Sequence, residues 1–202
     1  MKRIGMFVVV TLLAAAGCGS KPPAAPPPAT TQAGSAPPPS STASATPSAS
    51  PETLIEFSVD GAGPYQLGAT LATLQSSPGL DEVTSGGSAC PGNTNARGTG
   101  TWRDIRLSFR KDGMLYLAVN RSPSIPTPSG AWLGTTLAQL KSIYVGIPGQ
   151  ELKQGSSTAY LVTTLSGRGI LFDLDATKKV ISMAAGDASY LKASYQGGTD
   201  FC

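Results

Sequence analysis

The chain of 202 residues contains no histidine. Ser-His-Asp and Cys-His catalysis both depend on imidazole as the proton carrier, and many zinc sites depend on it as a ligand. The sequence therefore excludes these kinds of site. Charge is also scarce, because only 13% of the residues are Asp, Glu, Lys or Arg. From Cys18 onward, 13 Lys and Arg against 12 Asp and Glu leave a net charge of +1, which does not indicate a nucleic-acid partner.

The chain also lacks a hydrophobic run long enough to cross a membrane. Its first apolar stretch, Ile4 to Ala16, has 13 residues, whereas a spanning helix needs about 20. Lys2 and Arg3 place positive charge directly before this stretch. A short apolar run after a basic start is typical of a secretory signal peptide. The sequence predicts that residues 1–17 are this signal peptide.

Cys18 directly follows the small residues Ala15, Ala16 and Gly17. This Ala-Ala-Gly-Cys tetrapeptide resembles the lipobox of bacterial lipoproteins. The resemblance implies cleavage before Cys18, a diacylglyceryl thioether on its sulfur and an acyl chain such as palmitate on its amine. Stable anchoring needs more than one acyl chain, so the expected location is the extracytoplasmic face of the cell membrane. The alternative is an ordinary secretory signal in which Cys18 is incidental.

Residues 18–51 form a separate, low-complexity region. Between Lys21 and Pro51, 28 of 31 residues are Pro, Ala, Ser or Thr. Such a composition cannot bury enough apolar surface to offset its conformational entropy. We expect a disordered tether that holds the following domain away from the membrane. At about 3.1 Å per residue in polyproline II geometry, its maximal reach is roughly 95 Å.

Only three cysteines are present, and Cys18 is assigned to lipid. The other two, Cys90 and Cys202, lie in residues 52–202, a region long enough for one domain with a sizeable core. An extracytoplasmic location is oxidising enough for a disulfide. We therefore expect a Cys90–Cys202 bridge, which stabilises by up to about 4.7 kcal/mol in the chain-entropy model. A nucleophilic Cys90 is the alternative, but the chain has no histidine to activate it.

A ten-residue segment occurs twice in this domain. Residues 67–76 read Leu-Gly-Ala-Thr-Leu-Ala-Thr-Leu-Gln-Ser, and residues 133–142 read Leu-Gly-Thr-Thr-Leu-Ala-Gln-Leu-Lys-Ser, with seven of ten positions identical. In each copy a threonine, Thr70 or Thr136, precedes leucines at helical spacing. A threonine in this place can cap free amide groups with its hydroxyl. The pattern predicts one short helix in each copy.

Alternating strand patterns follow each expected helix. Residues 105–109 and 115–119 alternate apolar and polar side chains on either side of a Lys-Asp-Gly turn. This pattern predicts a half-buried antiparallel hairpin. Residues 170–174 and 180–185 repeat it, and residues 159–165 read as an additional strand of the second copy. The sequence thus predicts two units, each with a helix and antiparallel strands.

We therefore expect an α+β fold in one domain of two repeats, about 55–122 and 123–202. The apolar-Gly-x-Thr helix entry followed by an antiparallel sheet, twice, resembles the secreted β-lactamase-inhibitor proteins. It is also similar to small outer-membrane assembly lipoproteins and to uncharacterised actinobacterial lipoproteins. The resemblance covers roughly residues 55–185 and implies a non-catalytic module that binds proteins. The inhibitors have a short disulfide in each repeat and this chain does not, so no functional residue is transferred.

The first hairpin is locally basic and offers a candidate ligand face. Arg106 and Arg110 are expected on its outward side, with Tyr116 on the neighbouring strand. Anionic wall polymer, lipid head groups or a small ligand could bind there. The alternative is a solvated strand face whose charges prevent edge pairing. The Gly-rich segment 85–100 reads as a long, polar, ordered surface loop and is a second candidate contact surface.

Two further patterns suggest chemistry that the chain does not otherwise support. Ser189 and Lys192 match the Ser-x-x-Lys motif of penicillin-binding enzymes, but the Lys-Thr-Gly motif is missing and the domain is too small for that fold. Asp173 and Asp175 share one side of a strand, but a calcium site needs 6–8 oxygen ligands. We expect these carboxylates on a solvated face, with no metal, no cofactor and no catalytic residue.

Aromatic residues dominate protein contact sites, but Tyr65 and Trp132 precede the two helix entries and are expected in the core. The leading hypothesis is a membrane-anchored, non-enzymatic module that binds an envelope or extracellular protein. It would bind through the outer face of the sheet or through segment 85–100. The alternative is a binder of anionic wall polymer or a small ligand, centred on Arg106 and Arg110.

Overall fold

The computed structural model describes residues 55–88 and 90–198. These residues belong to a compact unit, Ala49–Cys202, whereas the unit Met1–Ser48 lies outside the described residues. The expected signal peptide, the lipid site Cys18, the tether and Cys202 also lie outside them and stay predictions. Within the described part of the chain, no helix is long and apolar enough to cross a membrane.

The duplicated segments form the helices α1 (Leu71–Ser76) and α2 (Leu137–Ile143). The hydroxyl of Thr70 accepts a hydrogen bond from the backbone N–H three residues later at 3.2 Å. Thr136 accepts the equivalent bond from Gln139 at 3.3 Å, and the Gln139 side chain accepts the Thr136 N–H at 2.9 Å. This reciprocal pair is a capping box. Both predicted helix entries are therefore confirmed.

The backbone around the two helix entries is the same in both repeats. Gly68 donates to the carbonyl of Leu115 at 2.7 Å, and Gly134 donates to the carbonyl of Val180 at 2.8 Å. The residue after each glycine accepts a bond back from the same strand, at 2.9 and 3.0 Å. Each helix entry is thus tied to the last strand of its own repeat. The duplication in sequence is a duplication of structure.

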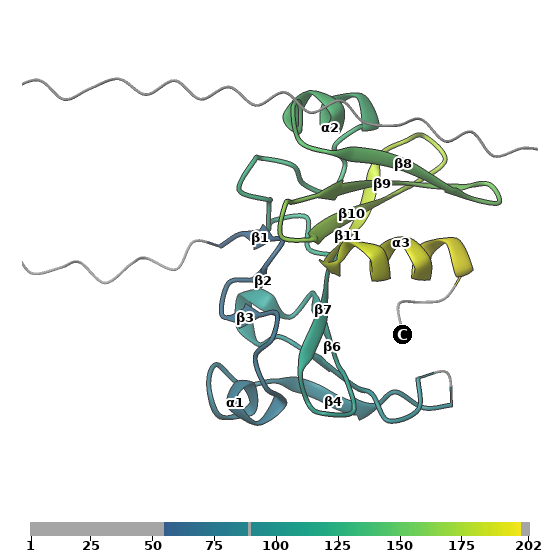
Figure 1. The fold of residues 1–202 in the computed structure, drawn as a ribbon. Helices are drawn as coiled ribbons and strands as arrows, with labels where there is room; N and C mark the ends of the chain where they lie inside the picture. Colours follow the sequence, from purple (N-terminus) through teal and green to yellow (C-terminus); the bar gives the residue numbers. More distant parts are fainter. Residues whose placement is uncertain (1–54, 89, 199–202) are drawn as a thin grey trace, which may run out of the picture. The chain divides into compact units, whose positions relative to one another are not determined.

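Each repeat contributes four consecutive strands to one eight-stranded antiparallel sheet. These strands are β4 (Asp81–Ser85), β5 (Thr94–Arg97), β6 (Ile105–Phe109), β7 (Leu115–Asn120), β8 (Gly149–Gln154), β9 (Ser157–Thr163), β10 (Arg168–Leu174) and β11 (Val180–Asp187). Their order is β4-β5-β6-β7-β11-β10-β9-β8. The last strands of the two repeats, β7 and β11, therefore pair at the centre, and the repeats are related by an approximate two-fold rotation (Figure 1). The predicted α+β class is confirmed.

The four-stranded first repeat corrects two expectations. Segment 85–100, expected as a long loop, contains β5, which pairs with β4 on one side and β6 on the other. The strand expected at 159–165, now β9, is therefore not an addition to the second repeat, because β5 is its counterpart. The edge strands β4 and β8 escape detection in the sequence because nearly all their side chains are exposed. Exposed strands lack the apolar alternation on which strand prediction depends.

A small three-stranded sheet precedes α1. Its strands are β1 (Phe57–Ser58), β2 (Gly61–Ala62) and β3 (Tyr65–Gln66). Phe57 and Tyr65 are fully buried and join the main core with residues of both helices. Tyr65 thus lies in the core as expected. The expectation for Trp132 is wrong, because its side chain is 56% exposed.

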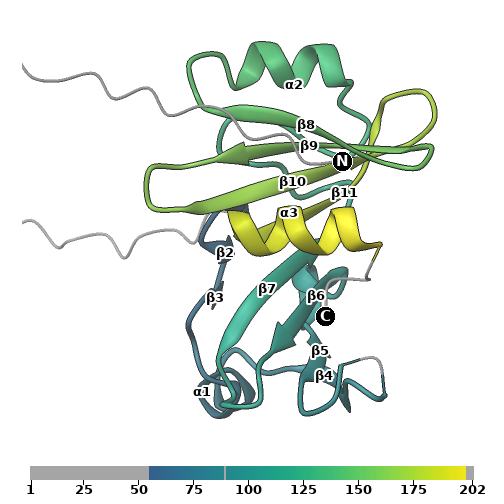
Figure 2. The same cartoon turned by 45° about the vertical axis from the view of Figure 1, so that its right-hand side comes forward.

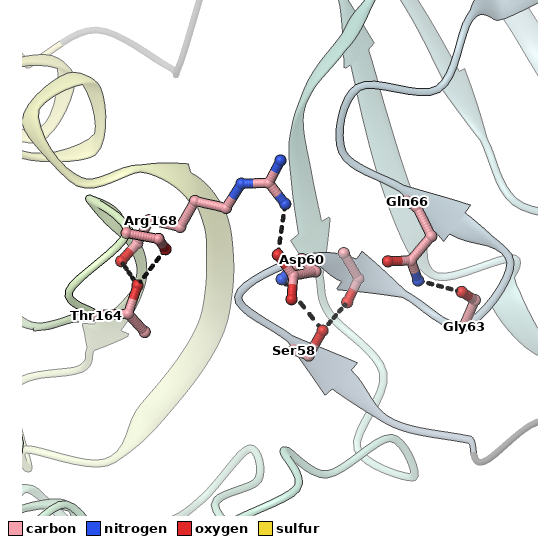
Figure 3. Close-up of polar contacts among 8 residues, drawn as sticks. Ser58, Asp60, Gly63, Gln66, Thr164 and Arg168 are labelled. Atoms are coloured by element: carbon pink, nitrogen blue, oxygen red, sulfur yellow. Dashed lines mark hydrogen bonds and ion pairs between the residues drawn. The ribbon is translucent and has the colours of Figure 1, made fainter.

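An ion pair also links the small sheet to the second repeat. The carboxylate of Asp60, in the turn between β1 and β2, lies 2.5 Å from the guanidinium of Arg168 at the start of β10. Figure 3 shows this pair reaching across from separate parts of the fold. The two residues are 108 positions apart in the sequence. The ion pair therefore exists only because the chain folds back on itself.

A third helix, α3 (Ala188–Gly197), follows β11 directly. The Asp187 side chain accepts the Tyr190 N–H at 2.8 Å, and Gly198 ends the helix in the left-handed region. Both are familiar helix boundaries. This helix is not predicted from the sequence, because no loop separates it from the preceding buried strand β11. Its boundaries are nevertheless visible in the sequence.

Helix α3 lies on the opposite face of the sheet from α1 and α2. It packs on β8 to β11 and meets β7 at its margin, where the rings of Tyr190 and Tyr116 are in contact, and within the described residues it leaves β4 to β6 uncovered (Figure 2). Under it, a second apolar cluster is separate from the main core. Its buried members are Leu117, Leu152, Ala159, Leu161, Leu171, Ala184, Ala188, Leu191 and Tyr195.

Candidate functional site

One face of the sheet changes character between the two repeats. Along a single cross-strand row, Arg97 is paired with Arg106, Arg106 with Val119, Val119 with Ala184, and Ala184 with Leu171. Helix α3 covers the apolar end of this row, where Ala184 and Leu171 are buried. Within the described residues, no helix covers the arginine end. We call this side of β4 to β7 the uncovered face.

A groove of about 430 Å³ lies on the uncovered face. It extends from the edge strand β4 to strands β10 and β11 of the other repeat. Three arginines line it, Arg97, Arg106 and Arg121, together with the acids Glu82 and Asp173. We call this site the arginine groove. The remaining lining is neutral and includes Thr84, Asn95, Ser108, Leu117, Val119 and Ser182.

The positive charges in the arginine groove are unevenly balanced. The Nε atom of Arg97 lies 2.9 Å from Oε2 of Glu82, so this arginine has a carboxylate partner. Arg106 forms no ion pair with any residue in the described parts of the chain. A guanidinium can donate two parallel hydrogen bonds to a carboxylate or phosphate. Arg121, which also lines the groove, likewise forms no ion pair among the described residues, so Arg106 and Arg121 are the groove cations available to an anionic ligand.

Asp173 lies at the far end of the arginine groove and is half-buried. The expectation of a solvated face is therefore wrong for this residue. Burial raises the pKa of its carboxyl above the ordinary value, and a backbone hydrogen bond from Leu174 and the charge of Arg121 oppose this shift. Asp175 instead accepts the backbone N–H of Thr177 at 2.8 Å in the following turn. Among residues 55–88 and 90–198, no group of three or more acidic or cysteine side chains is placed to hold a metal.

Tyr116 and Arg110 lie outside the lining of the groove. The guanidinium carbon of Arg110 is 5.3 Å from the centre of the Tyr116 ring. The Tyr116 hydroxyl accepts a hydrogen bond from Asn93 at 3.2 Å, and its ring meets Tyr190 edge-on at 5.4 Å. Burial is the main cause of the raised pKa of Tyr116. The predicted face is therefore divided: Arg106 lines the groove, and Arg110 stacks on Tyr116 outside it.

Three other residues of the sequence analysis, Cys90, Ser189 and Lys192, can be placed. Cys90 lines the arginine groove and is half-buried. Its expected partner Cys202 lies outside the described residues, so the disulfide stays a prediction. Ser189 is exposed on α3, and the Lys192 ammonium donates to Gln150 at 3.1 Å. The structure thus gives Lys192 a hydrogen-bond partner other than Ser189.

Sequence reasoning located only part of this site. It predicted Arg106, because apolar and polar residues alternate clearly in the first hairpin. The predicted ligand face did not include Arg97, although this residue follows Asn95 at the two-residue spacing of a strand face. No local signal places Asp173, from the second repeat, beside the first hairpin. That proximity results from the pairing of β7 with β11. The groove is therefore a product of the sheet and not of any one segment.

No protein-family model and no curated protein matches the chain. Two solved structures are weakly similar in fold. The uncharacterized protein yfeY from Escherichia coli is 17% identical, with a TM-score of 0.44 over 65% of this chain and 99% of that one. An extracellular protein containing a SCP domain from Bacillus anthracis is 9% identical, with a TM-score of 0.42 over 62% of this chain. The match spans only 46% of that second protein, and neither similarity carries a functional argument.

Proposed function

We propose that this chain is a lipid-anchored, non-enzymatic module of the cell envelope that binds an acidic segment of a partner protein in the arginine groove. The observation that carries the proposal is the divided sheet face. Its apolar half is covered by α3, and its uncovered half holds Arg106 without an ion-pair partner among the described residues. An acidic side chain of a partner supplies the missing charge.

The neutral lining of the groove also suits a protein ligand. The half-buried Val119 forms an apolar part of the lining above the buried Leu117, and the Ser108 hydroxyl bonds to Asn95 at 2.9 Å. Protein contact sites typically combine an apolar centre with arginine and a polar rim. A partner segment with a carboxylate next to an apolar side chain matches this arrangement. The expected tether and lipid would place the groove outside the membrane.

The proposal can be tested in the native membrane with two charge-reversed variants. The full-length protein is cross-linked to its neighbours, and the cross-linked partner is quantified by mass spectrometry. Arg106→Glu is expected to reduce recovery of the partner at least about tenfold, which corresponds to about 1.4 kcal/mol. Arg103→Glu is the matched control, because Arg103 is exposed and lies outside the groove lining. Equal recovery with both variants would contradict the proposal.

An anionic wall polymer is a second candidate ligand. It is favoured by Arg110, which is exposed and held over Tyr116, so that positive charge continues beyond the groove. Electrostatic binding to a polymer weakens steeply with salt, because exposed charges are screened. Polymer retention that disappears at high salt and in the Arg106→Ala, Arg110→Ala double variant would support this candidate. Salt-resistant binding to one protein would exclude it as the main ligand.

A further inference from the structure

A second groove, also of about 430 Å³, runs along α2 and shares no lining residue with the arginine groove. We call it the Trp132 groove. In contrast to the arginine groove, it has no charged side chain in its lining among the residues that the structure describes. Its lining comprises Gly130, Trp132, Thr135, Ala138, Gln139, Ser142 and Ile143.

The fold does not need the indole of Trp132. Its backbone N–H donates to the Thr135 hydroxyl at 3.0 Å, and its carbonyl accepts the Thr135 N–H at 3.2 Å. The first repeat builds the same turn, since Ala69 donates to the carbonyl of Gln66 at 3.0 Å. Gln66 occupies the position that corresponds to Trp132. The turn therefore forms without an aromatic side chain, and yet the second repeat exposes 56% of a tryptophan there.

The polar groups of the Trp132 groove are held in defined orientations. The Oε1 atom of Gln139 accepts two hydrogen bonds, from the N–H and the hydroxyl of Thr136, both at 2.9 Å. The capping box thus fixes the Gln139 carboxamide and leaves its Nε2 hydrogens available as donors. The Ser142 hydroxyl donates to the carbonyl of Ala138 at 3.3 Å, which leaves its oxygen available as an acceptor. The groove therefore offers one oriented donor and one acceptor beside an exposed ring.

We propose that the Trp132 groove binds a hexopyranose unit of a neutral polysaccharide. The C–H face of the sugar lies on the Trp132 ring, and its hydroxyls bond to Gln139 and Ser142. A sugar combines these two properties, because its ring faces are apolar and its rim consists of neutral donors and acceptors. The groove is open rather than enclosed, so it suits one unit of a long polymer better than an isolated small molecule, which sites usually surround.

The lining argues against other ligand classes. An anion finds no cation in the groove, and a cation finds one aromatic ring but no carboxylate. An apolar side chain of a protein would bury the amide of Gln139 without a partner, which is unfavourable. A single ring and two hydrogen bonds support only millimolar affinity. Repeated units of one polymer compensate for this weakness by raising the effective concentration.

Two variants are expected to remove sugar binding while the protein still folds. Trp132→Gln introduces the residue that the first repeat has at this turn. Gln139→Glu keeps an acceptor for the Thr136 cap, because glutamate is common at this position of a capping box, but it removes the Nε2 donor. Leu165→Gln is the control, since Leu165 is a fully exposed apolar residue in the turn between β9 and β10. Thermal unfolding is measured for all three variants.

The full-length protein, in a sugar-free zwitterionic detergent, is titrated with neutral pentasaccharides of glucose, galactose and mannose and with an acidic pentasaccharide of galacturonic acid. We expect millimolar binding of at least one neutral probe. This binding should weaken at least about tenfold in Trp132→Gln and Gln139→Glu and stay unchanged in Leu165→Gln. No binding of a neutral probe to the wild type, equal binding by Trp132→Gln, or tighter binding of the acidic probe would each overturn the proposal.

Discussion

Arg97 and Arg106 occupy directly paired positions on the neighbouring strands β5 and β6, so two guanidinium-bearing side chains leave the sheet on the same side. Like charges at directly opposed positions destabilise a sheet. The ion pair between Arg97 and Glu82 balances one of these charges. The other charge, on Arg106, has no such partner within the described residues. We expect this arrangement to lower the stability of the free protein and a bound anion to offset the repulsion.

Removing Arg106 should therefore stabilise the protein. We expect Arg106→Ala to raise the free energy of unfolding by about 0.2–0.5 kcal/mol, because the repulsion from Arg97 disappears. The measurement is chemical denaturation of the wild type and the variant in parallel. Arg103→Ala should have no such effect, since Arg103 lies outside this pair. A loss of stability in Arg106→Ala would show that the two charges do not repel.

The half-buried Asp173 gives a prediction on pH. Because burial raises the pKa of its carboxyl, the folded state binds a proton at a higher pH than the unfolded state, whose pKa is about 3.9. Stability from this group therefore rises as the pH falls through the folded pKa toward the unfolded value. Asp173→Asn should abolish this rise and, at neutral pH, stabilise the protein by less than about 1 kcal/mol.

Denaturation curves collected between neutral and acidic pH would test this prediction, with the exposed-site variant Asp104→Asn as the charge-matched control. The same Asp173→Asn variant should bind an acidic partner more tightly, because the arginine groove loses a negative charge. Weaker binding would argue against an anionic ligand. If the stability of the wild type and of Asp173→Asn changed with pH in the same way, the acid stabilisation could not be assigned to the Asp173 carboxyl.

Tyr116 should make the protein sensitive to alkali. Its pKa is raised, mainly by burial and next by its contact with Tyr190, whereas an unfolded tyrosine ionises near pH 10. Below about pH 10 both states keep the proton, so stability is unaffected. Above it only the unfolded state loses the proton, and stability falls as the pH rises.

Tyr116→Phe removes this contribution and should flatten the alkaline loss of stability. At neutral pH the variant should be less stable by about 1 kcal/mol, because the hydrogen bond with Asn93 is lost. Denaturation at neutral and alkaline pH, together with tyrosinate absorbance, provides the measurement. An unchanged alkaline slope would mean that Tyr116 does not resist ionisation.

The two helix caps allow a matched comparison between the repeats. Thr70→Ala and Thr136→Ala each remove a hydroxyl that accepts a helix N–H. Each change should cost about 1 kcal/mol, and serine at either position should restore most of the loss. Thermal unfolding of the four variants would show this. A negligible cost at either position would mean that the strand contacts alone hold that helix entry.

The lipid anchor is tested most directly at its cysteine. Cys18→Ser should release the protein from the membrane fraction, because the diacylglyceryl group needs the sulfur. Fractionation of cells that express either form, followed by immunoblotting, provides the measurement. Unchanged membrane retention of Cys18→Ser would contradict the lipobox interpretation and leave the ordinary secretory signal.

Local chemistry explains why the helix entries and both hairpins could be predicted. Thr70 and Thr136 cap helices through residues only three positions away. The alternation in β6 directly reflects which side chains are buried, whereas β10, expected to be half-buried like β6, is buried on both faces because α3 packs on it. The exposed edge strands β4 and β8 carry no such signal. Tyr65 and Trp132 were both expected in the core, but Trp132 occupies the position of the exposed Gln66, whereas the counterpart of Tyr65 in the second repeat is the buried Ala131.

By itself, the sequence determined the duplication, the caps, the strand alternation and the α+β class, since each depends on residues close together in the chain. Only the tertiary structure decided that β7 pairs with β11, that α3 covers one half of a sheet face, and that Arg106 and Asp173 share a groove. The pairing of β7 with β11 and the shared groove of Arg106 and Asp173 each join residues more than 60 positions apart, and no local pattern encodes a contact of that range. The candidate site therefore arises from the packing of the two repeats into one sheet.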